Sequence, residues 1–302
     1  MKLKINSNVP QADPYVIAHN GTYFMYVTGE DGVGVFTSKD FINWDYFGIC
    51  YQNEGQKSYW APSVIELDNM FYMYVSTMPV GESDTHLQRI QVAISDSPCG
   101  PFKFHNYLLP AFSIDAHVVK SGKDLYIFYS ENNYEAKRAG TYIYLRKLIT
   151  PYEASENKKC VVRPTLDEEI YLRDRFKKGQ HWHTIEGPFY LRSGEYHYLM
   201  YSGACYGNDT YFIGYSVAKG DTDDLLSLDF RKYPSDDIYE PLITKDKYEE
   251  GTGHNSVLKI KDKHYVIYHG RDYNDERDIV DLRTARICEL IINNGTLNIS
   301  HR

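Results

Sequence analysis

The chain is organised as a five-fold repeat. Each repeat opens with a short polar or Trp-Ala-Pro head, and a run rich in aromatic residues follows about ten residues later. The five heads are Asp13, Trp60-Ala61-Pro62, Asp115, Glu186 and His254. Internal repeats are typical of folds in which each unit buries its apolar face only by stacking on its neighbours. Because the heads change while the aromatic runs are kept, we expect one scaffold that brings different side chains to one place.

Each repeat reads as a set of antiparallel strands. In the first repeat, Asn20-Gly21 separates two β-rich runs, which is a strong hairpin signal, and segments 34–38 and 41–47 add two further strands. Four antiparallel strands make one blade of a β-propeller, and every interval between heads is long enough for one blade. We therefore predict an all-β fold, a five-bladed β-propeller with four antiparallel strands per blade. The prediction treats residues 1–302 as one domain, with the heads on its innermost strands.

Two intervals contain charged, less periodic segments, at roughly 153–179 and 221–237. We expect them to be insertions that project from one face of the propeller. A short helix around 167–175 and a loop are both compatible with the first of them. Neither segment has the Gly, Pro or Ser enrichment of a domain linker.

The composition limits the classes of partner. The net charge is −8 and no basic patch stands out along the sequence, so a nucleic-acid backbone would be repelled. Most of the 29 tyrosines are expected to be strand residues, although tyrosine also suits sugar-binding surfaces. The five cysteines are odd in number and widely spaced, which fits neither a disulfide framework nor a zinc site. No apolar run approaches the length of a membrane span or a signal peptide, so we predict a cytoplasmic protein without a membrane partner.

Three of the heads carry carboxylic acids, at Asp13, Asp115 and Glu186. The innermost strands of a propeller converge, so these groups would meet in one axial pocket. Crowded like charges shift one another's pKa values, and one acid is then held protonated near neutral pH. Glycoside hydrolysis needs such a pair, one carboxyl to protonate the leaving oxygen and an ionised one to activate water. Turn capping by Asp13 and Asp115 is the alternative, and their shared position within the repeat favours catalysis.

At these residues the chain resembles glycoside hydrolase family 43, over essentially its full length. The resemblance implies a five-bladed propeller that cleaves furanosides and xylosides with inversion of configuration. It also implies that Asp13 is the general base, Glu186 the general acid, and Asp115 the group that orients Glu186 and raises its pKa. The segments that carry the resemblance are Ala12-Asp13-Pro14, Trp60-Ala61-Pro62, Ile114-Asp115-Ala116, Ile185-Glu186-Gly187-Pro188 and Gly251-Thr252-Gly253-His254-Asn255-Ser256-Val257.

Four further residues each have two alternative interpretations. By the same resemblance, His254 lies near a structural calcium ion or a water cluster, although one imidazole is a poor calcium site and a satisfied core histidine is the alternative. Trp60 is expected to stack on the sugar, or else to be a packing tryptophan. Arg283 matches an arginine that reaches substrate hydroxyls, with a solvated surface arginine as the alternative. Trp182, within Gln180-His181-Trp182-His183, is expected to contact sugar, because no further ligands support a His-x-His metal site.

The leading hypothesis is an inverting, exo-acting glycosidase that releases α-L-arabinofuranosyl or β-D-xylosyl units from plant-polysaccharide-derived oligosaccharides. The two sugars present similar hydroxyl patterns to a small pocket, so the sequence does not choose between them. No organic cofactor is predicted. One alternative is a non-catalytic glycan-binding propeller. Another is an enzyme of a related five-bladed family that acts on a different glycan by hydrolysis or phosphorolysis.

Overall fold

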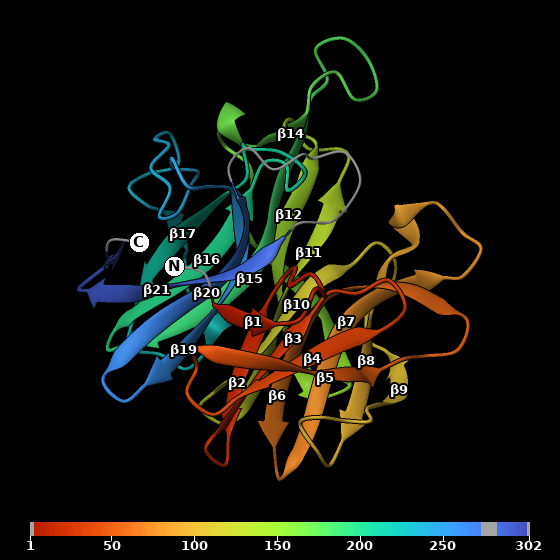
Figure 1. The fold of residues 1–302 in the computed structure, drawn as a ribbon. Helices are drawn as coiled ribbons and strands as arrows, with labels where there is room; N and C mark the ends of the chain where they lie inside the picture. Colours follow the sequence, from red (N-terminus) through yellow and green to blue (C-terminus); the bar gives the residue numbers. More distant parts are fainter. Residues whose placement is uncertain (1–2, 273–282, 301–302) are drawn as a thin grey trace.

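A computed structural model describes residues 3–272 and 283–300, and within them the chain folds into strands and three short 3₁₀ helices (Figure 1). The prediction of an all-β fold is confirmed for this part of the chain. None of the helices found there is long and apolar enough to cross a membrane. All five cysteines are free thiols.

The strands form five antiparallel units that follow one another along the chain, and consecutive strands in each unit pair as hairpins. The first unit contains β2 (Tyr15–His19), β3 (Thr22–Val27), β4 (Val33–Ser38) and β5 (Asn43–Tyr51), with β1 (Lys4–Asn6) parallel to β5. The second contains β6 (Gln56–Leu67), β7 (Met70–Pro79), helix η1 (Thr85–Leu87), β8 (Arg89–Ser95) and β9 (Lys103–Tyr107). The third contains β10 (Ile114–Ser121), β11 (Asp124–Asn133), β12 (Gly140–Thr150) and β13 (Glu153–Val162).

Helix η2 (Asp167–Glu169) and β14 (Ile170–Leu172) connect the third unit to the fourth. The fourth unit contains β15 (Trp182–Ser193), β16 (Tyr196–Gly203), β17 (Phe212–Lys219), helix η3 (Leu225–Ser227) and β18 (Arg231–Lys232). The fifth contains β19 (Glu249–Ile260), β20 (Lys263–Asp272), β21 (Thr284–Asn293) and β22 (Thr296–Ile299). A two-residue parallel pairing of β12 with β15 joins the third and fourth units into one nine-stranded sheet.

The first strand of each unit contacts the first strands of the units before and after it. Contacts run from β2 to β6, β10, β15 and β19, and β19 contacts β2 again, an order that can be followed in Figure 1. Five apolar cores fill the spaces between neighbouring units, including one between the fifth unit and the first. Of the twelve largest fully buried side chains in the described residues, ten are tyrosines, so tyrosine serves here mainly as a core residue. Each unit therefore buries its faces on two neighbours, as the repeat predicts.

The heads of the repeat are places where the backbone leaves regular strand geometry. One residue at each head has a positive φ, namely Asp13 (53°), Ala61 (47°), Asp115 (59°), Gly187 (60°) and His254 (46°). The pairing register shifts at this point in β6, β10, β15 and β19, which marks a bulge. A bulge re-aims a side chain, and a left-handed non-glycine residue costs on the order of 1–3 kcal/mol. Strain at the same place in four of the five units, with a glycine in the fourth, indicates that the heads have a function other than stability.

The first charged interval differs from its prediction. Residues 153–162 form β13, the regular outer strand of the third unit, instead of an insertion. Most of β13 is exposed or half-buried, which is why it lacks an apolar alternation. In the segment where helix and loop were both open, only residues 167–169 are helical, as a single 3₁₀ turn before β14.

Candidate active site

Six of the seven predicted site residues line one small cavity with a volume of about 120 Å³. Asp13 directly precedes β2, and Trp60, Asp115, Glu186 and His254 belong to β6, β10, β15 and β19. Arg283 directly precedes β21. We call this space the catalytic cavity, and its lining is Asp13, Thr28, Trp60, Ile114, Asp115, Glu186, Tyr206, Tyr211, His254 and Arg283.

Asp13 is a buried carboxylate with cationic and hydroxyl partners. Thr28 Oγ1 donates to its Oδ2 at 2.5 Å, while Arg283 Nη1 lies 3.5 Å from Oδ1. His254 Nδ1 and His269 Nδ1 lie 3.4 Å and 3.2 Å from the same oxygen. Burial disfavours the charge, but Arg283, with smaller contributions from the two histidines, outweighs it and holds the pKa of Asp13 well below its usual value. Asp13 is therefore ionised at neutral pH and can accept a proton.

Glu186 is shifted in the opposite direction. Burial, together with the negative charge of Asp13, raises its pKa to about 7, although a hydrogen bond from Tyr211 and the charge of Arg283 act against the rise. The Tyr211 hydroxyl donates to Glu186 Oε1 at 2.8 Å. Glu186 can thus hold a proton near neutral pH and release it to a substrate oxygen.

Asp115 lies against the backbone of the Glu186 strand. Its Oδ2 accepts a hydrogen bond from the Gly187 N–H at 3.0 Å. Burial, followed by the charges of Glu186 and Asp13, raises the pKa of Asp115 well above its usual value. Burial is the largest cause of the raised pKa of both acids, and the charges of Asp115 and Glu186 repel each other. The hydrogen bond to Gly187 also gives Asp115 a contact that fixes the backbone next to Glu186.

Side chains that close the second strand of a unit hold the head of the next unit. Thr28, after β3, donates to Asp13 and also accepts from the Ala61 N–H at 2.8 Å. Ser202, in β16, accepts from the His254 N–H at 2.7 Å. At these two heads the hydroxyl satisfies an amide that the bulge removes from the ladder.

The sequence reasoning missed two buried aromatic residues that contact the acids. His269 in β20 accepts from the Asp13 N–H at 3.1 Å, and burial lowers its pKa to about 4, so its ring is neutral at pH 7. The Tyr211 ring stacks on His269 with an interplanar angle of 9°. His269 occupies the closing position of the fifth repeat, which is the one signal that could have identified it. Tyr211 precedes β17 and has no comparable sequence signal.

Trp182 does not line the catalytic cavity. It is 3% exposed, and its ring lies 5.2 Å from that of Tyr134 and 5.9 Å from that of Phe176. The Arg175 guanidinium lies 4.5 Å from the Trp182 ring. Trp182 therefore packs beneath a loop, and the predicted sugar contact is not retained. Trp60 is half-buried and does line the cavity, so stacking on a sugar stays a prediction for that residue.

The surroundings of His254 do not fit a calcium ion. Its Nδ1 faces Asp13 Oδ1, and the Arg283 guanidinium approaches the same oxygen, so a metal would compete with a fixed positive charge. Calcium requires about six to eight oxygen ligands. Within residues 3–272 and 283–300, no group of three His, Cys, Asp or Glu side chains is placed to hold a metal. We therefore assign no step to a metal.

Comparison with known proteins identifies the family. The model described as Glycosyl hydrolases family 43 matches residues 7–297. The chain belongs to this family. It is accordingly a glycoside hydrolase, and the predicted resemblance is confirmed. Solved structures agree in fold: a thermostable family-43 glycoside hydrolase has a TM-score of 0.81 and 28% identity, over 98% of this chain and 95% of that chain. An α-L-arabinofuranosidase from Lactobacillus brevis has a TM-score of 0.79 and 21% identity over the same shares.

Two curated proteins are also similar in sequence to this chain. An extracellular exo-α-(1→5)-L-arabinofuranosidase of Cellvibrio japonicus is 24% identical over 286 residues, which cover 87% of this chain and 79% of the relative. A xylosidase/arabinosidase of Thermoclostridium stercorarium is 23% identical over 308 residues, which cover 86% of this chain and 58% of the relative. The prediction of a cytoplasmic location is contradicted by the first of these proteins, which is extracellular. That prediction rested only on the lack of an apolar signal-like segment, and it is not retained.

Proposed function

We propose that the five units are the blades of a single five-bladed β-propeller domain. Each unit has four strands, and the inner strands contact one another in a closed cyclic order. The five apolar cores between neighbouring units support the same arrangement, since an open row of five blades would have only four. The catalytic cavity then lies where the heads converge at the axis.

We infer that the enzyme is an inverting, exo-acting glycosidase that releases α-L-arabinofuranosyl or β-D-xylosyl units from plant-polysaccharide-derived oligosaccharides. The observation that carries this proposal is the opposite shift of two carboxyl pKa values in one cavity, downward for Asp13 and upward for Glu186. Such a pair provides a base and an acid at the same pH. The names of the two curated relatives support the choice of sugars.

In the proposed reaction, Asp13 accepts a proton from a water molecule while the water oxygen forms a bond to the anomeric carbon. Glu186 gives its proton to the glycosidic oxygen as the bond from that oxygen to the anomeric carbon breaks. The freed sugar carries the inverted configuration, and a second proton exchange with water restores both carboxyl groups. Asp115 acts as a positioning residue through its hydrogen bond to the Gly187 N–H.

The size of the cavity supports exo action. A volume of about 120 Å³ equals the share of roughly four water molecules in the liquid, which suits one sugar unit better than a chain. Trp60 and Tyr206 supply aromatic walls for the apolar face of a sugar ring. Arg283 lies 3.5 Å from Asp13 and supplies donors for sugar hydroxyls or for the attacking water.

The test uses nitrophenyl α-L-arabinofuranoside and β-D-xyloside with purified protein, and proton NMR of an oligosaccharide digest to identify the first anomer formed. We expect release from at least one of the two glycosides and an inverted first product. No release from any pentoside would overturn the substrate class. A retained first anomer would overturn the base assignment and make one of the aspartates a nucleophile. Turnover that requires phosphate would indicate phosphorolysis.

A further inference from the structure

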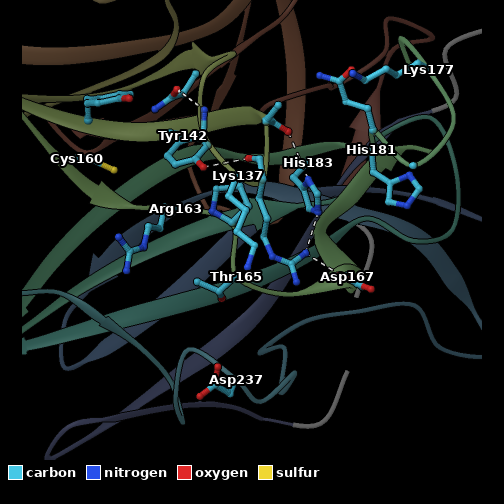
Figure 2. Close-up of a pocket in the computed structure, with 18 of the residues that line it drawn as sticks. Lys137, Tyr142, Cys160, Arg163, Thr165, Asp167, Lys177, His181, His183 and Asp237 are labelled. Atoms are coloured by element: carbon cyan, nitrogen blue, oxygen red, sulfur yellow. Dashed lines mark hydrogen bonds and ion pairs between the residues drawn. The ribbon is translucent and has the colours of Figure 1, made fainter. Parts of the chain in front are cut away.

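A second and much larger cavity lies beside the start of the strand that carries Glu186. Its volume is about 1090 Å³, and Figure 2 shows the side chains that line it. Three segments form its walls: 133–139 from the last residue of β11 to the residue before β12, 163–167 after β13, and 177–181 before β15. His183 of β15 also lines it, and Glu186 follows three residues later on the same strand, at roughly 3.3 Å per residue. We call it the basic pocket.

The basic pocket has the opposite charge to the rest of the molecule. Its two carboxylates, Asp167 and Asp237, are outnumbered by five cations on a chain whose net charge is −8. A concave surface lined by one sign of charge focuses the field and raises the local concentration of oppositely charged ligands. The five cations are Lys137, Arg138, Arg163, Lys177 and Lys178.

Most of these cations are not neutralised within the protein. Arg138 Nη1 donates to Asp167 Oδ1 at 2.7 Å and also contacts His183 Nε2 at 2.9 Å. For the other four, which are all exposed, no ion pair occurs with any residue of the described ranges. Positive charge that serves no internal pairing is therefore concentrated around one hollow.

The sequence analysis found no basic patch along the chain, and the structure brings one together from separate segments. The cations come from three segments that are separated along the chain, and only the packing of β12 against β15 brings them together. Figure 2 places Lys137 and Arg163 on one side of His183 and Lys177 on the other. A compact anion such as phosphate needs donors that converge on one point. Cations distributed along a hollow suit a ligand with several separated negative charges.

We propose that the basic pocket binds the carboxylates of hexuronate residues in an oligosaccharide. The proposal rests on the proposed function, because it makes the ligand part of the polymer from which the enzyme removes neutral sugars. Pockets for organic ligands typically measure about 300–1,000 Å³, so this one has room for several sugar units. Asn133, Thr165 and Gln180 add neutral polar groups that suit sugar hydroxyls. Acidic substrates would then be held next to the catalytic strand.

The test compares binding of trigalacturonate and of its fully methyl-esterified form, which keeps the shape and removes the charge, by isothermal titration calorimetry. We expect the wild-type enzyme to bind only the acid, more weakly as salt is added. The variant Lys137→Ala/Arg163→Ala should raise the Kd roughly threefold to tenfold, since each exposed charge contact contributes modestly. Lys177→Ala/Lys178→Ala is a second variant in case the first does not fold.

Lys103→Ala/Lys120→Ala is the matched control, because it removes two exposed lysines outside the basic pocket. The control should bind trigalacturonate like the wild type. Equal binding of the methyl ester, an unchanged Kd in both pocket variants, or no binding at all would overturn the proposal. Displacement of trigalacturonate by inorganic phosphate at equal concentration would also overturn it, since that would indicate a site for any anion.

Hydrolysis of the neutral nitrophenyl pentosides should be unchanged in the pocket variants. A wild-type enzyme that binds trigalacturonate but does not hydrolyse the nitrophenyl pentosides would instead refute the proposed function.

Discussion

Replacing Tyr211 with phenylalanine should extend the activity of the enzyme to higher pH. The Tyr211 hydroxyl donates to Glu186 Oε1 at 2.8 Å and lowers the pKa of Glu186, which burial raises to about 7. Glu186 acts as an acid and must be protonated, so kcat/KM falls as pH rises through its pKa. Without the hydroxyl, the ionised form loses its hydrogen bond and the pKa rises. The basic limb of the pH profile should therefore move upward.

The size of the shift follows from the difference between two hydrogen bonds. A hydrogen bond to a charged group contributes about 1.5–3 kcal/mol, and one to a neutral group about 0.5–1.5 kcal/mol. Their difference, about 1–1.5 kcal/mol, corresponds to roughly one pKa unit. Phenylalanine keeps the ring that stacks on His269, so the packing of this buried site is preserved.

The assay is kcat/KM for a nitrophenyl pentoside between about pH 4 and 9. Tyr206→Phe is the matched control, because Tyr206 lines the same cavity but makes no hydrogen bond to Glu186 among the described contacts. Its basic limb should stay in place even if its KM changes. A basic limb of Tyr211→Phe that stays in place or moves to lower pH would refute the assignment of Glu186 as the acid that Tyr211 contacts.

Three further predictions concern the base and the fold. Asp13→Ala should lower kcat by about 10²–10⁴ with unchanged circular dichroism, and an activity of a tenth of wild type would remove Asp13 from the mechanism. Arg283→Met should move the acidic limb of the pH profile upward, because Arg283 holds the pKa of Asp13 down and the base must be ionised; an unmoved limb would contradict this. Lys232→Met should reduce the free energy of unfolding by about 3–5 kcal/mol in urea denaturation, because it leaves Glu169, 0% exposed, without its buried partner. Adding Glu169→Gln should recover much of that loss, and no recovery would show that packing, not charge, is the cause.

The meeting of the three carboxylic acids in one cavity could be predicted from the sequence because their positions follow the repeat. Asp13, Asp115 and Glu186 occupy the same place in their units, and the structure has a left-handed residue or bulge at that place each time. A local backbone feature that recurs in every repeat favours similar residues at the same position of each repeat, so it can be recognised in the sequence. The closing Thr28 and Ser202 follow from the same regularity, since each satisfies an amide at the next head.

Residues that are positioned by packing between units show no such repeated pattern in the sequence. Tyr211 reaches Glu186 only because Gly253 leaves room for it: a Cβ on Gly253 would lie 1.9 Å from Tyr211 Cε1. One tyrosine among 29 carries no sign of this contact in the sequence. Trp182 shows the converse. Its position between two histidines, shortly before the acid, suggests a residue on the rim of the site, whereas the preceding loop folds over its ring and buries it.

The different protonation states of Asp13 and Glu186 follow from the kind of partner that each carboxyl group has. Asp13 and Glu186 are both removed from water, which alone would raise both pKa values. Asp13 faces the guanidinium of Arg283, whose charge stabilises only the ionised carboxyl. Glu186 has the Tyr211 hydroxyl, a neutral donor that can bond to the carboxyl in either protonation state. A cation on one side and a neutral donor on the other thus separate the two pKa values, so that at neutral pH Asp13 is the group able to accept a proton and Glu186 the group able to give one.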